Sequence, residues 1–90
     1  MYVWDEAKRK SNLAKHGLDF CDAALVYENP EKCTYTSDRM DEKRWLDLAL
    51  VHIHGRVLAL AYTMRGADVR IISFRMASRE EREQYEQDAK

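Results

Sequence analysis

Hydrophobic residues follow two different periods along the chain. Up to about residue 28 they recur every three or four positions, as the buried face of a helix requires. From about residue 33 the period changes to two, as Leu46, Leu48 and Leu50 show, which is typical of strands. The pattern therefore predicts helices in the first part of the chain and a sheet in the second.

Two N-terminal helices are expected from their end residues. Asp5 can cap a helix that runs to about His16, and Gly17 supplies a C-terminal stop. Asp19 can cap a second helix that ends before the Asn29-Pro30 pair. The apolar face of this second helix consists of Phe20, Ala23, Ala24 and Tyr27.

Three strands are expected at 44–51, 57–63 and 69–75, and they should form an antiparallel meander with short connections. The range 33–36 is a further short strand candidate. In the strand at 44–51, Leu46, Leu48 and Leu50 share one face. His54-Gly55 is a plausible tight turn, because glycine adopts a positive φ at low cost.

The last helix begins with a capping box, in which Ser78 stands three residues before Glu81. The expected fold class is α+β. Two N-terminal helices precede an antiparallel sheet of three or four strands, and one helix follows it. We expect the helices to pack on one face of the sheet, in a single domain over residues 1–90.

The composition excludes several classes of protein. Of the 90 residues, 46% are hydrophobic and 34% charged, which is too apolar for a disordered chain. No apolar run reaches the roughly 20 residues that span a bilayer, and the first residues lack the apolar stretch of a signal peptide. Two cysteines alone make no disulfide scaffold. We therefore expect a cytoplasmic protein without a membrane partner.

Charge is unevenly distributed, although the net charge is only −1. Six of the nine arginines lie in the last 35 positions, and Asp68 is the only acidic residue between Arg56 and Arg79. A nearly neutral protein with one locally basic face can still bind phosphate groups.

Motifs near both ends of the chain make a family resemblance visible. The pattern W-D-x-x-K-x-x-x-N-x-x-K-H-G-x-x-F runs from Trp4 to Phe20. Later stand Tyr62-Thr63-x-Arg65 and Arg70-Ile71-Ile72-Ser73-x-Arg75-x-Ala77. Together these motifs resemble the BrnT family of bacterial toxins over nearly the whole chain.

This resemblance implies a RelE-like fold and a ribonuclease toxin of a type II toxin–antitoxin module, which inhibits translation. It also implies a BrnA-type antitoxin that neutralises the toxin by direct binding, with operator DNA contacted only through the antitoxin. Whether RNA is cut free or on the ribosome is left open. One departure is that the stretch 38–44 contains no histidine, where typical members carry one.

The residues suit metal-free cleavage of RNA, in which the 2′-OH attacks the adjacent phosphorus. Such a cut needs a proton acceptor, cations for the phosphorane charge and an acid for the 5′ oxygen. The sequence has no acidic cluster at metal-ligand spacing, no P-loop and no G-x-S-x-G motif. We therefore expect neither a metal nor another cofactor.

Arginine is the preferred side chain for phosphate, because it is always charged and binds in a bidentate manner. Arg75 shares a face with Ser73, whereas Arg70 points to the opposite face if the last strand is regular. The RelE-like resemblance favours Arg75 as a catalytic residue, and it implies that Tyr85 in the following helix assists it.

Three further catalytic candidates are Arg65 in the turn before the last strand, His16 and Glu42. The expected substrate-binding residues are Lys15, Arg70 and Arg44. Each has a structural alternative, since strand arginines often form ion pairs and a cationic histidine stabilises a helix C-terminus. The chain as a whole also has an alternative, a non-catalytic module that binds RNA or protein through the same arginine-rich face.

Overall fold

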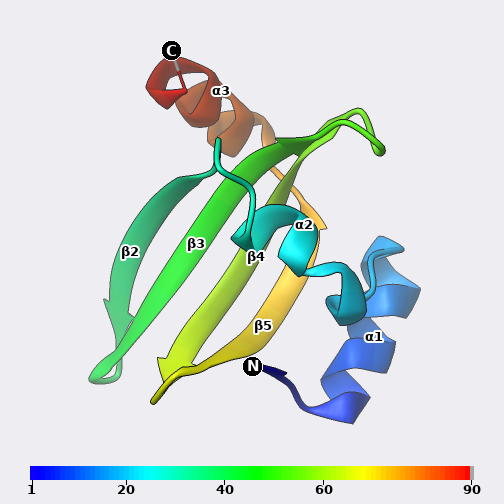
Figure 1. Cartoon of the computed structure of the whole chain (residues 1–90), viewed down its shortest axis with the longest axis vertical. Coiled ribbons are helices and arrows are strands. Elements are labelled where there is room, and N and C mark those ends of the chain that lie inside the picture. Colours follow the sequence, from blue (N-terminus) through cyan, green and yellow to red (C-terminus); the bar gives the residue numbers. More distant parts are fainter. Residues whose placement is uncertain (90) are drawn as a thin grey trace.

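A twisted sheet of five strands forms the frame of the protein (Figure 1). The computed structural model describes residues 1–89, except for the side chain of Arg39. The strands are β1 (Tyr2–Val3), β2 (Cys33–Arg39), β3 (Glu42–Val51), β4 (Arg56–Arg65) and β5 (Asp68–Met76). The helices are α1 (Glu6–His16), a 3₁₀ turn (Phe20–Asp22), α2 (Ala24–Tyr27) and α3 (Arg79–Asp88).

The sheet is mixed, with strand order β1-β5-β4-β3-β2. The meander from β3 to β5 is antiparallel, as predicted, and the strand candidate at 33–36 extends it as β2, which pairs antiparallel with β3. The prediction missed β1, which pairs in parallel with β5 through Tyr2 and Val3. A strand of two residues is too short to show a hydrophobic period, so the sequence gives no sign of it.

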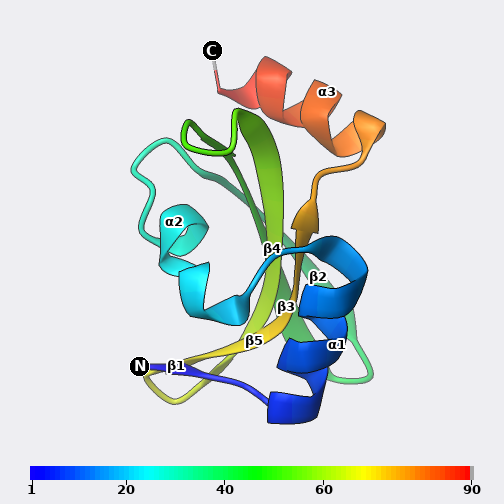
Figure 2. The same ribbon diagram turned by 90° about the vertical axis from the view of Figure 1, so that its right-hand side faces the viewer.

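The expectation that all helices pack on one face is wrong. The 3₁₀ turn and α2 cover one face, where Phe20 and Val26 pack with Leu60 of β4, and α1 lies against β5. Helix α3 lies across one end of the opposite face, where Tyr85 packs with Leu48 (Figure 2). Strand β3 is apolar at nearly every position after residue 47, so its pattern indicates burial without choosing a face.

The helix ends follow local rules. In α1, the Asp5 carboxylate accepts hydrogen bonds from the backbone N–H groups of Ala7 (2.9 Å) and Lys8 (3.2 Å). Gly17 ends that helix at φ +72°, and the predicted capping box of α3 is present. The predicted second helix is instead a 3₁₀ turn followed by one α-helical turn, although Asp19 caps it as expected.

Asn12 attaches α1 to the edge of the sheet. Its side chain is almost fully buried, and its Nδ2 donates to the carbonyl oxygens of Phe74 (2.7 Å) and Leu18 (3.0 Å). Its Oδ1 accepts from the N–H of Phe74 at 3.1 Å. One amide side chain therefore satisfies both backbone groups of a strand residue that has no neighbouring strand on that side.

We expect Asn12→Ala to lower the free energy of unfolding by about 2–4 kcal/mol, because it leaves buried backbone groups of Phe74 and Leu18 without partners. Urea denaturation measures the change. Ser11→Ala, at the exposed neighbouring position of α1, is the control and should stay within about 0.5 kcal/mol of the parent. Equal effects of both substitutions would contradict this role of Asn12.

Candidate active site

A β-bulge at Ile72 determines which side chains of β5 share a face. Opposite it, β4 is regular, so every second residue of β4 points to the same side of the sheet. On one side these residues are Thr63, Ala61 and Ala59. Their paired neighbours on β5 are, in the same order, Arg70, Ser73 and Arg75. Since paired residues in an antiparallel ladder lie on the same face, the three β5 side chains share one face.

This arrangement corrects the expectation for a regular strand, which placed Arg70 and Arg75 on opposite faces. The bulge adds one residue to β5 without adding one to β4, so the alternation is reset between Ile71 and Ser73. No glycine or proline marks the position in the sequence. Both arginines are therefore directed to the face that α1 and α2 do not cover.

The second wall of this face is β3. Leu46 of β3 pairs with Ala61, so Arg44, two residues earlier, points to the same side. The short side chains of β4 lie between β3 and β5 and make a low floor. We call this surface, where α3 leaves the sheet uncovered, the open face. Its residues are Arg44, Leu46, Ala61, Thr63, Arg70 and Ser73.

Arg44 and Arg70 carry charges that their surroundings do not neutralise. Among the side chains of residues 1–89 that the structure describes, no carboxylate forms an ion pair with either guanidinium. The Nε atom of Arg44 is buried and has no hydrogen-bond partner. An unsatisfied buried donor is costly, and such a group in a folded protein calls for an explanation, of which a functional role is one.

Arg75, by contrast, is held by a carboxylate of α3. Its two terminal nitrogens donate to the two oxygens of Glu81 at 2.7 and 3.0 Å. The bond to Arg75 is the main cause that lowers the pKa of Glu81 to about 2, and the same bond raises the pKa of Arg75. This bidentate pair fixes the start of α3 at the border of the open face.

Glu42 and Arg65 lie together at the far end of the open face. Glu42 precedes Arg44 by two residues on β3, and Arg65 follows Thr63 by two residues on β4. A guanidinium nitrogen of Arg65 is 3.7 Å from a Glu42 carboxylate oxygen, and both side chains are partly exposed. The structure thus brings Glu42, Arg44, Arg65 and Arg70 to one region.

The other sequence-predicted residues lie apart from this region. Tyr85 is the buried residue of α3, on the side of the helix that faces the sheet. Its hydroxyl accepts from the N–H of Leu50 (3.3 Å) and donates to the carbonyl of Glu31 (3.4 Å). Lys15 and His16 are at the end of α1, in a hollow of about 240 Å³ that also includes Ser73. Their roles in chemistry stay predictions.

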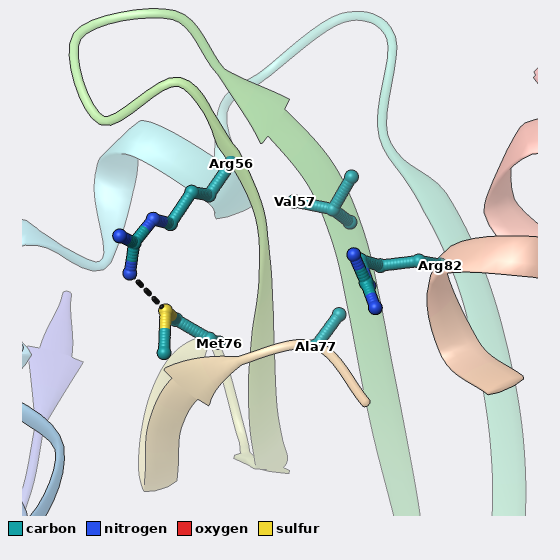
Figure 3. Close-up of a pocket in the computed structure, with 5 residues that line it drawn as sticks. All are labelled: Arg56, Val57, Met76, Ala77 and Arg82. Carbon is teal, nitrogen blue, oxygen red and sulfur yellow. Dashed lines mark hydrogen bonds between the residues drawn. The ribbon is translucent and has the colours of Figure 1, made fainter. Parts of the chain in front are cut away.

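Two basic residues without a predicted role line a further hollow of about 320 Å³ (Figure 3). Arg56 comes from the start of β4, and Arg82 comes from α3. The sequence signal was the clustering of arginines in the last third of the chain. That clustering could not separate these two from the arginines of the open face.

Comparison with known proteins identifies the family. The family model described as the ribonuclease toxin, BrnT, of type II toxin–antitoxin systems matches residues 4–81. The chain belongs to the BrnT family. No curated protein sequence matches it at a significant level.

Membership confirms the resemblance drawn from the two motif regions. This BrnT chain is accordingly a ribonuclease toxin of a type II toxin–antitoxin module, with an antitoxin as partner and RNA as target. Within residues 1–89, no helix has the length and apolar character needed to cross a membrane. No group of three or more His, Cys, Asp or Glu in the same range is placed to hold a metal ion.

Because the folded-state pKa of Glu81 lies below its ordinary value of 4.5, the Arg75 pair stabilises the fold above about pH 4.5. That contribution is lost as pH falls from 4.5 toward 2. We expect Glu81→Gln to make stability less dependent on pH in this window, measured by urea denaturation. The exposed Glu83, which pairs with Arg79 at 3.2 Å, provides the control Glu83→Gln. A profile of Glu81→Gln identical to the parent would contradict this assignment.

Proposed function

We propose that this BrnT toxin cleaves RNA on the open face without a metal ion. The observation that carries the proposal is the bulge at Ile72, which directs Arg70 to the same face as Arg44. Within residues 1–89, these two cations have no carboxylate partner, and they flank the short side chains of Ala61 and Thr63 on β4. Such a surface can accept a sugar–phosphate backbone.

The reaction is a transfer of the phosphoryl group within the RNA. The 2′ oxygen forms a bond to phosphorus while the bond from phosphorus to the 5′ oxygen breaks. The products are a 2′,3′-cyclic phosphate and a free 5′-OH. The Glu42 carboxylate takes the 2′ proton in this scheme, and Arg65 orients that carboxylate across the 3.7 Å gap. Solvent returns a proton to the leaving 5′ oxygen.

Arg44 and Arg70 supply the positive charge that the phosphorane requires. Each well-placed donor of this kind is worth roughly 10²–10³ in rate. Arg75 lies at the α3 border, where Glu81 holds it in position, and it would contact the RNA beside these two arginines. Tyr85 would support this border from below, while Lys15 and His16 would contact RNA beyond Ser73.

Loss of RNA by this route would inhibit translation and growth in the cytoplasm. The open face is shallow, so a strand displayed on a ribosome could reach it as readily as a free strand. Cleavage assays with and without ribosomes distinguish the two substrates.

We further propose that the partner is a BrnA-type antitoxin that covers the open face, and that only the antitoxin contacts operator DNA. A mainly apolar hollow of about 180 Å³ adjoins the arginines, between the sheet and α3. It is lined by Tyr35, Leu46, Leu48, Glu80, Glu81 and Gln84. An antitoxin segment with an apolar side chain here and carboxylates toward Arg44 would match both features.

Arg70→Ala and Arg44→Ala should each reduce cleavage of end-labelled RNA in excess EDTA by roughly 10²–10³-fold, because each removes charge stabilisation. Arg75→Ala, tested beside them, shows whether the arginine held by Glu81 also takes part. Arg79→Ala removes an exposed arginine of α3 and should leave the rate unchanged. Undiminished cutting by both open-face variants would reject the site, and RNA bound but never cut would indicate a binding module.

Leu46→Lys should weaken binding of the antitoxin by at least about tenfold, because it places a charge in the apolar hollow. Calorimetry with the purified antitoxin measures this change. Leu25→Lys is the control, since Leu25 is 41% exposed on α2, on the covered side of the sheet. If only the Leu25 substitution weakened binding, the antitoxin would be located on the other face.

A further inference from the structure

A band of basic side chains follows the edge of the sheet beside β5. These side chains line three adjoining hollows of about 320, 380 and 240 Å³. The first lies under α3 and the third lies along α1, so the band extends from one end of the molecule toward the other. Its cationic and histidine side chains are Arg82, Arg56, His54, His16, Lys15 and Lys8.

The three hollows form one continuous surface. The first and second share Arg56 and Met76, and the second and third share His16. The third also includes Ser73, which belongs to the open face. A chain molecule bound in the band would therefore arrive at the proposed site of cleavage without crossing a gap.

No carboxylate lines any of the three hollows in the described part of the chain. Arg56 donates to the thioether sulfur of Met76 at 2.6 Å, and such a sulfur is a weak acceptor. Figure 3 shows Arg56 and Met76 on one side of the first hollow, with Arg82 reaching in from α3 on the other. Neither arginine forms an ion pair within residues 1–89. Both guanidinium groups are thus available to an anion.

Apolar side chains are interspersed with these cations. Ile53 is 84% exposed and Met76 is 48% exposed, and both line the second hollow. The bases of a single nucleic-acid strand alternate with its phosphates, so these aliphatic groups between cations give the bases apolar contact area, without the stacking that aromatic rings provide. An acidic protein segment could pair with the cations. It would cover Ile53 and Met76 only if it also carried apolar side chains at the same spacing.

We propose that this edge band is a second RNA-binding site, which holds the single-stranded backbone on one side of the scissile phosphate. The inference rests on the proposed function only in taking RNA as the ligand. Its consequence is a preference for substrates long enough to reach from the open face, past Ser73 and His16, to Arg56 and Arg82.

The test uses the full chain and a 12-nucleotide RNA with 2′-O-methyl groups throughout, which lacks the nucleophile and stays intact. Fluorescence anisotropy measures affinity across a salt series. A plot of log K against log salt has a negative slope. The variant Arg56→Gln/Arg82→Gln should make this slope less steep by about 1.4, because each phosphate contact on a single strand contributes about 0.7. The control Arg79→Gln changes an exposed arginine of α3 outside the band and should keep the parent slope.

A second measurement compares cleavage of a dinucleotide with cleavage of the unmodified 12-mer. The double variant should raise KM for the 12-mer and leave the dinucleotide unaffected. A parent slope in the double variant, or loss of antitoxin binding with no change in RNA binding, would overturn the edge band. If the parent binds in the expected way but cuts neither substrate, the proposed function fails while the edge band stands.

Discussion

The buried amide of Asn12 is the contact on which the arrangement of the site depends. It bonds to both the N–H and the carbonyl of Phe74, two residues after the bulge at Ile72. That position fixes Phe74 toward the core and, by alternation, Ser73 and Arg75 toward the open face. The same side chain anchors α1, which carries part of the edge band. One polar residue therefore sets the relative position of both proposed RNA-binding surfaces.

The two faces of the sheet differ in what they bury. The side under α1 and α2 encloses even a carboxylate: Asp47 is fully buried and accepts from Lys32 (2.7 Å), Thr34 (2.7 Å) and Tyr62 (3.1 Å). These three donors replace the hydrogen bonds to water that the Asp47 carboxylate loses when it is buried. The other side is closed only at one end by α3. Stability is thus concentrated on one face, which leaves the second face free to carry unpaired charge.

Local signals in the sequence predicted local structure well. Asp5, Gly17 and the Ser78–Glu81 box gave the helix ends, because capping depends on residues a few positions apart. The same reasoning named Arg44 and Arg70 as phosphate-binding residues, but it could not place them together. Their proximity depends on the bulge, which is an outcome of long-range packing. The parallel strand β1 and the face chosen by α3 were missed for the same reason.

Spacing along the ladder differs from spacing along the chain in β5. Arg70 and Arg75 are five positions apart in the chain, yet their partners Thr63 and Ala59 on β4 are four positions apart, because Ile72 has no partner of its own. A chain that lacked this one residue would keep the same register and the same two arginines on the open face. Two proteins whose last strands differ in length by one residue can therefore present an identical pair of arginines. Structural register, rather than position in an alignment, is what would have to be preserved between them.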